Sequence, residues 1–228
     1  MNYPYLLFDA DDTLFDFPKA SARAFAVMCE KHGISNTPEV YQIYHDINKV
    51  LWAAFDRGEV TKEYLTLERY VRFLHALNIT DQDPAQCNRD YLTALGESVF
   101  PLPYAEEVCQ ELAQRGHQLY IVTNAVASVQ RSRLERSGFS RWFQGAFISE
   151  EAGASKPSKA YFDYVRAQLP ELTAENCLVI GDSLSSDIKG ANNAGLPCCW
   201  FNPKGQPITE KLHADYEISD LRQLLNIV

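Results

Sequence analysis

Two aspartates, Asp9 and Asp11, directly follow the apolar run Tyr5-Leu6-Leu7-Phe8 near the start of the chain. Such a run is typical of a buried strand in a parallel sheet, and ligands of open α/β sheets bind beyond the carboxyl ends of the strands. Side chains two positions apart in an extended chain point the same way, so the two carboxylates are expected to crowd together. A divalent cation, or protonation of one carboxylate, relieves their repulsion. The pattern therefore indicates either a metal site with an aspartate nucleophile and a neighbouring acid, or an acidic turn that caps a helix.

Other polar groups fall at the ends of predicted strands or in the loops after them. These groups are Thr123 with Asn124 after a β-rich run, Lys156 before Pro157 in a loop, and Asp182 with Asp187 after the run Leu178-Val179-Ile180. Thr123 and Asn124 can donate hydrogen bonds to a phosphoryl oxygen, and Lys156 can neutralise both a phosphate and the charge on Asp9. Asp182 can complete the oxygen shell of a metal ion, while Asp187 can hold a metal-bound water or Lys156.

Each of these residues also has an ordinary structural explanation. Thr123 can cap a helix, Lys156 can be a solvated surface lysine, and Asp187 can be a first-turn acid favoured by the helix dipole. Capping alone does not readily produce acids, a hydroxyl, a lysine and acids again at successive strand ends. The combined pattern therefore favours a shared site for a phosphoryl group.

Composition narrows the class of protein. The chain has 228 residues, of which 46% are hydrophobic and 12% aromatic, as in globular proteins with a substantial core. The net charge of −9 argues against binding to a nucleic-acid polymer, but it leaves room for a small phosphorylated metabolite.

The cysteines and the length of the apolar runs indicate the cellular compartment in which the protein is expected. The six cysteines form no Cys-x-x-Cys pair and have no zinc spacing, so buried thiols in a reducing compartment are expected. No apolar run is long enough to cross a membrane, and residues 1–4 lack a signal pattern. We therefore expect a cytoplasmic protein with no membrane partner.

The order of the predicted elements indicates two domains. Residues 17–100 have helical periodicity almost throughout, whereas β-rich runs at 118–124, 146–149, 178–180, 197–201 and 216–218 alternate with helices. Alternation predicts an α/β fold with a parallel sheet flanked by helices. We therefore expect a catalytic core formed by residues 1–16 and 101–228, with an inserted all-helical domain over 17–100.

The motifs resemble those of the haloacid dehalogenase (HAD) superfamily. The resemblance rests on Asp9-Ala10-Asp11-Asp12-Thr13, Thr123, Lys156-Pro157, and Gly181-Asp182-Ser183 with Asp187, and it spans nearly the whole chain. It implies a Rossmann-like core and identifies the helical insertion as similar to the C1 cap. The stretches Ala191–Gly195 and Trp200–Pro203 look most like those of YjjG-type pyrimidine 5′-nucleotidases.

The resemblance also implies roles for individual residues. Asp9 would be the nucleophile that forms an aspartyl-phosphate, and Asp11 the acid and then the base. Mg²⁺, with Mn²⁺ as a possible substitute, would be held by Asp9, the Asp11 carbonyl and Asp182, with Asp187 bracing the site. Thr123 and Lys156 would fix the phosphoryl oxygens. Dehalogenases lack the second acid, so Asp11 favours phosphoryl chemistry.

The expected reaction is the Mg²⁺-dependent hydrolysis of nucleoside 5′-monophosphates, with pyrimidine nucleotides as the expected class. Phe15, Asn48 and Trp52 are candidate substrate contacts, although the aromatic residues can equally be packing residues. A sugar-phosphate phosphatase, a phosphosugar mutase and an inactive nucleotide-binding regulatory protein are alternatives. The expected partner is a small phosphorylated metabolite, and the chain is expected to be a monomer or a homodimer.

Overall fold

The computed structural model describes residues 3–208 and 211–228. Contacts within the chain divide it into two compact units. One contains the described part of Met1–Phe17 together with Val99–Val228, and the other is Pro18–Ser98. The sequence predicted these boundaries at 16 and 101, where the structure has 17 and 99.

The first unit is built on a six-stranded parallel sheet. In chain order the strands are β1 (Tyr5–Phe8), β2 (Gln118–Thr123), β3 (Phe143–Ile148), β4 (Cys177–Gly181), β5 (Cys198–Phe201) and β6 (Tyr216–Ile218). Their order in the sheet is β3-β2-β1-β4-β5-β6, so β1 lies between β2 and β4. Phe8 at the end of β1 is in register with Ile121 and Ile180. The predicted α/β parallel sheet is therefore confirmed, and the residues that follow these three strands meet at one edge.

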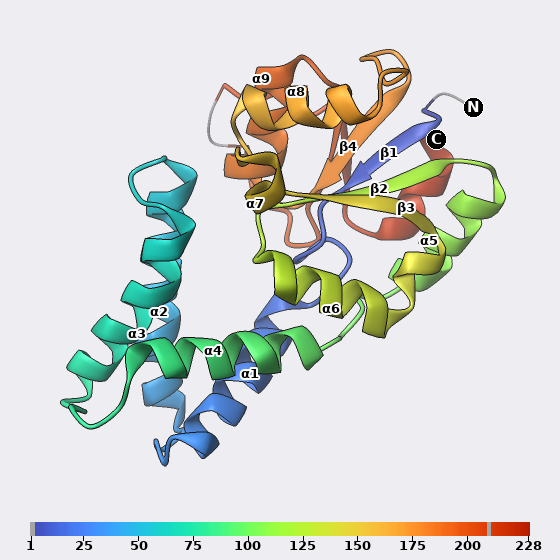
Figure 1. Cartoon of the computed structure of the whole chain (residues 1–228). Helices are drawn as coiled ribbons and strands as arrows, with labels where there is room; N and C mark the ends of the chain where they lie inside the picture. The colour runs from blue at the N-terminus through green and yellow to red at the C-terminus, as the bar shows by residue number, and fades with distance from the viewer. Residues whose placement is uncertain (1–2, 209–210) are drawn as a thin grey trace. The chain divides into compact units, whose positions relative to one another are not determined.

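Helices cover both faces of this sheet, as Figure 1 shows. Leu6 and Phe8 point toward α5 (Ala105–Gln114), α6 (Ala127–Ser137) and the short helices η1 (Phe139–Arg141) and η3 (Leu221–Asn226). Tyr5 and Leu7 point toward α8 (Lys159–Gln168) and α9 (Lys189–Ala194). Two apolar layers enclose the sheet, which explains why β1 is apolar at every position.

Several strand and helix boundaries differ from what the sequence indicates. Strand β3 begins at Phe143 rather than Ala146, and the short helix α7 (Ser149–Ala152) that follows it was not predicted. Helix α8 begins only at Lys159, where Ser158 caps it, so Lys156 lies in the loop before it. The turn η2 (Leu184–Ile188), which precedes α9, is π-helical. Such short irregular turns leave no periodic signal in a sequence.

The second unit is an all-helical bundle of α1 (Phe17–Lys31), α2 (Pro38–Asp56), α3 (Lys62–Ala76) and α4 (Pro84–Glu97), with α1 starting at the last residue of the first unit. Thr37, Thr61 and Asp83 cap α2, α3 and α4 by accepting backbone N–H groups with their side chains. The rings that fill the bundle are Phe25, Tyr44, Tyr70, Phe73 and Tyr91. Aromatic packing accounts for the stability of this insertion.

All six cysteines are buried free thiols, whereas the sequence indicated buried thiols for several of them. Within the part of the chain that the structure describes, no helix has the length and apolar character needed to span a bilayer.

Candidate active site

A tight turn after β1 presents the two aspartates to different partners. The backbone N–H of Asp9 donates to the Ile180 carbonyl at 2.8 Å, which continues the sheet. Leu14 and Phe15 both donate to the Ala10 carbonyl at 2.9 Å, and Asp12 has a φ of 61°. The turn therefore follows Asp11, which forms a β-bridge with Phe15, and the expectation that the Asp9 and Asp11 side chains point the same way stays a prediction.

Lys156 is the centre of the site. Its Nζ donates to Asp9 Oδ1 at 2.6 Å, to Asp187 Oδ1 at 2.6 Å and to the Val122 carbonyl at 2.7 Å. All three donor positions of the ammonium are used, and only 1% of the side chain is exposed. Burial alone would lower the pKa of Lys156, but Asp187 and Asp9 raise it above its ordinary value. Lys156 is therefore a buried permanent cation rather than a surface lysine.

Asn124 fixes the backbone of that lysine. Its Nδ2 donates to the Lys156 carbonyl at 2.8 Å, and its Oδ1 accepts the Lys156 N–H at 3.0 Å. The neighbouring Thr123 is buried, and its Oγ1 accepts the Ala125 N–H at 3.1 Å. The structure thus places both residues beside Lys156, while their contact with a phosphoryl oxygen stays a prediction.

Asp187 is fully buried and packs against a glycine. Its Oδ2 accepts the Ser183 N–H at 3.0 Å, while its Oδ1 accepts from Lys156. A Cβ on Gly181 would lie 2.3 Å from the carboxyl carbon of Asp187. A side chain at position 181 is therefore incompatible with the observed place of Asp187.

Gly181→Ala is expected to displace Asp187 and to destabilise the protein by about 3 kcal/mol, as overpacked sites commonly do. Lys156 would then lose one of its two carboxylate partners, so the site around it should be disrupted as well. Gly145→Ala is the matched control, since its Cβ would meet only Tyr120 ring atoms at 3.8 and 3.9 Å. Urea unfolding of both variants measures the difference. Equal stabilities would show that Asp187 is not held by this contact.

Three acids form a cluster suited to a divalent cation. Asp9, Asp182 and Asp187 each offer a carboxylate oxygen, and these oxygens lie within 4.8 Å of one another. Burial raises the pKa of Asp9 to about 8, with Asp187 adding to the effect and Lys156 opposing it. Burial, together with Asp187 and Asp9, also raises the pKa of Asp182 well above its ordinary value. The single positive charge of Lys156 does not balance the three carboxylates of this cluster. Mg²⁺, which prefers oxygen ligands, would supply the missing positive charge.

Neighbouring residues orient Asp182 within this cluster. The Thr13 hydroxyl donates to Asp182 Oδ1 at 3.4 Å, and the Trp200 indole N–H donates to the Asp182 carbonyl at 2.8 Å. Asp9, Asp182 and Asp187 are thus brought together as the sequence predicted. The Asp11 carboxylate pairs with Arg133 instead, and the contribution of its carbonyl to a metal site stays a prediction.

Mg²⁺ is expected to raise the melting temperature more at about pH 8 than at about pH 5. The folded pKa of Asp9 exceeds its unfolded value of 3.8, so the metal-free fold holds a proton that the unfolded chain releases. This stabilisation is complete at low pH and is lost as the pH rises from 3.8 toward about 8, where Mg²⁺ replaces the proton. Thermal unfolding with EDTA and with Mg²⁺ tests this. A Mg²⁺ effect independent of pH, or one unchanged in Asp182→Asn, would contradict it.

Asp11 meets an arginine that the motifs did not indicate. Arg133 Nη1 donates to Asp11 Oδ1, and the guanidinium lies over the Phe15 ring, 4.8 Å from its centroid. Phe15 is itself fully buried, and its ring centroid lies 5.1 Å from that of Phe139. This contact matches the alternative in which Phe15 is a packing residue rather than a substrate contact. In the sequence Arg133 is one of several arginines on a polar helix, so no local signal separates it from the others.

The two remaining candidates lie in the helical unit. Asn48 is buried, and its Oδ1 accepts from Arg69 Nη1 at 3.2 Å. Trp52 packs edge-on against Phe55, with ring centroids 5.5 Å apart. Their contact with substrate stays a prediction.

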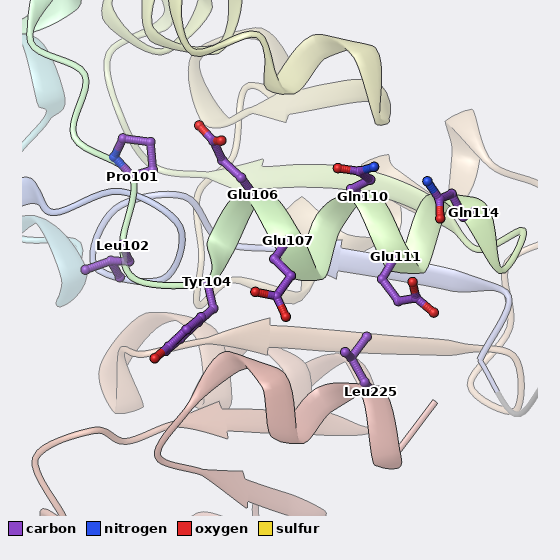
Figure 2. Close-up of a pocket in the computed structure, with 9 residues that line it drawn as sticks. All are labelled: Pro101, Leu102, Tyr104, Glu106, Glu107, Gln110, Glu111, Gln114 and Leu225. Carbon is purple, nitrogen blue, oxygen red and sulfur yellow. The ribbon is translucent and has the colours of Figure 1, made fainter.

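A separate groove of about 660 Å³ runs along α5. Figure 2 shows the glutamates Glu106, Glu107 and Glu111 of that helix along it, with Tyr104 at one end and Leu225 from η3. None of the predicted site residues lines this groove. It is therefore distinct from the site formed around Lys156.

Comparisons with known proteins agree with this geometry. YfnB of Bacillus subtilis, named as a HAD-hydrolase, is 38% identical and aligns over 99% of this chain and 95% of its own length. Its magnesium-bound crystal structure superposes with a TM-score of 0.93, covering 100% of this chain and 99% of that chain. Pyrimidine 5′-nucleotidase YjjG of Escherichia coli is 33% identical over 98% of this chain and 97% of its own. Pyrimidine 5′-nucleotidase PynA of Streptococcus pneumoniae is 30% identical over 99% of this chain and 95% of its own length.

The predicted superfamily is confirmed at the level of the whole chain. The sequence profile described as haloacid dehalogenase-like hydrolase matches residues 3–195, which include every motif residue around Lys156. Together with relatives above 30% identity over nearly the full length, this match shows that the protein belongs to the haloacid dehalogenase-like hydrolase family.

Proposed function

We propose that the protein is a Mg²⁺-dependent phosphomonoesterase that hydrolyses nucleoside 5′-monophosphates, with pyrimidine nucleotides preferred. The observation that carries the reaction type is the contact of one buried lysine with both Asp9 and Asp187, beside Asp182. The nucleotide preference is supported by the similarity to two pyrimidine 5′-nucleotidases over almost the full chain.

Asp9 is the proposed nucleophile because it combines a carboxylate with a fixed cationic partner. One Asp9 oxygen is held by Lys156, which leaves the other to form a bond to phosphorus while the bond to the leaving oxygen breaks. Lys156 fixes Asp9 and offsets the negative charge that a phosphoryl group brings into the site. When bound among Asp9, Asp182 and Asp187, Mg²⁺ supplies further electrostatic stabilisation of the transferred group.

Asp11 is the proposed acid and base. In the first step its proton goes to the leaving oxygen, which departs as the nucleoside alcohol. In the second step Asp11 takes a proton from water as the water oxygen bonds to phosphorus and the Asp9–phosphorus bond breaks. A quarter of the Asp11 side chain is exposed, which allows it to exchange protons with solvent. Such proton transfer is commonly worth about 10²- to 10⁴-fold in rate.

A phosphate-release panel tests the proposal. UMP, CMP, dUMP, dTMP, AMP, GMP and several sugar phosphates are incubated with Mg²⁺, with Mn²⁺ and with EDTA. We expect the fastest release from pyrimidine nucleotides with Mg²⁺ and none with EDTA. Release from sugar phosphates alone would replace the nucleotide assignment with that of a sugar-phosphate phosphatase. Isomerised sugar phosphate without free phosphate would instead identify a mutase, and tight nucleotide binding without turnover would identify a regulatory protein.

A further inference from the structure

Arg133 is among the most completely buried large side chains of the chain, and it reaches Asp11 from α6. Its exposed fraction is 0%, and its Nη1 donates both to Asp11 Oδ1 and, at 3.4 Å, to Gln130 Oε1. The Phe15 ring covers one face of the guanidinium. Burying the charged guanidinium costs free energy of desolvation. A residue with no role at the site would not be expected to carry that cost.

The remaining nitrogens of this arginine have no protein acceptor. Nε and Nη2 of Arg133, and Nε2 of Gln130, are buried without a hydrogen-bond partner among the described residues. Within residues 3–208 and 211–228, Asp11 is the carboxylate that forms an ion pair with Arg133. An arginine keeps its proton under all ordinary conditions, so its charge depends on Asp11 for compensation.

The pairing also decides where the Asp11 carboxylate lies. Asp9, Asp182 and Asp187 form the cation cluster, and Asp11 is not part of it although it is only two residues from Asp9. A carboxylate released near a divalent cation is readily captured as a further ligand, since anionic oxygens are the ligands such cations prefer. A captured carboxylate can no longer move a proton freely.

We propose that Arg133 is a positioning residue that holds the Asp11 carboxylate apart from the cation cluster and keeps it available for proton transfer. This inference rests on the proposed phosphatase reaction at the same site. Among the residues proposed to react, Arg133 contacts Asp11 alone, so its effect is expected to pass through that side chain.

The first test compares leaving groups in Arg133→Gln. For UMP, kcat is expected to fall about 10²-fold with little change in KM, because the alkoxide leaving group needs a proton. For p-nitrophenyl phosphate, the first-turnover burst of nitrophenolate is expected to keep its rate while the later steady state slows. Arg133→Lys should restore part of the activity. Arg131→Gln is the matched control, since Arg131 is an exposed residue of the same helix that pairs with Glu151.

The second test measures Mg²⁺ binding by calorimetry and needs no substrate. Arg133→Gln is expected to bind Mg²⁺ about tenfold more tightly, because the freed Asp11 adds a charged ligand. The double variant Asp11→Asn/Arg133→Gln should return to the wild-type affinity. If Arg133→Gln does not fold, this double variant and Arg133→Lys carry the comparison, since neither leaves the Asp11 carboxylate without its cation.

The outcomes separate this inference from the proposed function. A wild-type protein that cleaves p-nitrophenyl phosphate but no nucleotide removes the proposed substrate, whereas the burst and calorimetry tests still apply. A nitrophenolate burst slowed as much as UMP turnover, or an Arg133→Gln effect that persists in the Asp11→Asn background, would overturn the positioning role. Unchanged Mg²⁺ affinity in Arg133→Gln would do the same.

Discussion

Asp9→Asn is expected to abolish turnover while leaving the protein folded. The amide cannot form the bond to phosphorus that the carboxylate forms, so kcat should fall by about 10⁵-fold or more. Lys156 keeps its contacts with Asp187 and the Val122 carbonyl, so the buried cation remains compensated. Phosphate release from UMP and the near-UV circular dichroism spectrum together measure this result.

The control for this experiment is the same chemical change on the surface. Asp163→Asn alters an exposed aspartate that pairs with Lys159, and it should leave kcat within about twofold of the wild type. Retained activity in Asp9→Asn would eliminate the proposed nucleophile. A loss of activity accompanied by a loss of folded structure would instead assign Asp9 a structural role.

Lys156→Met should have the second large effect, on stability as well as on activity. Truncating the ammonium leaves Asp9 and Asp187 buried without their cation, and breaking a buried pair commonly costs about 3–5 kcal/mol. Activity should also fall by about 10³-fold, because removal of one preorganised electrostatic contact commonly costs that much. Chemical unfolding in EDTA measures the stability, and phosphate release with Mg²⁺ measures the activity.

A second substitution distinguishes the two effects of this change. Lys156→Met/Asp187→Asn removes one of the two unpaired carboxylates, so it should recover part of the stability without recovering activity. Lys159→Met is the control, since Lys159 is exposed and pairs with Asp163 on the surface. A Lys156→Met protein as stable as the wild type would show that Lys156 does not hold the buried acids.

The positions of the main site residues could be predicted because strand ends have a fixed geometry. Three apolar runs end just before Asp9, at Thr123 and just before Asp182, and parallel pairing brings those ends to one edge. Lys156 follows no strand of this kind. Its place beside Asp9 was inferred from charge complementarity and from the family's motif order, and the structure brings it there.

The sequence did not indicate the contacts that depend on how side chains from different elements pack together. The Asp11 carboxylate pairs with Arg133 rather than joining the acidic cluster around Asp9, and nothing in an acidic stretch encodes that choice of partner. Arg133 lies on a helix with low hydrophobic content, and only the tertiary fold distinguishes it from Arg131 or Arg136. The sequence likewise indicates only that Gly181 ends a strand. The structure shows that its lack of a side chain leaves the space that Asp187 occupies.

In the helical unit, too, local features can be predicted from the sequence and contacts between helices cannot. Thr37 and Thr61 cap α2 and α3 by accepting N–H groups three residues further along the chain, a local contact that a sequence can indicate. Asn48 was singled out as a polar residue on an aromatic helix face, but its partner Arg69 comes from another helix. Contacts between helices depend on packing that periodicity does not specify.

The most direct test of the account is rapid acid quenching of a single turnover, followed by mass spectrometry of the peptide that contains Asp9. With Mg²⁺ and UMP, the account predicts a transient mass increase of one phosphoryl group on that peptide, which decays as free phosphate appears. Phosphate released without labelling of any residue, or a phosphoryl group found on a different side chain, would contradict it.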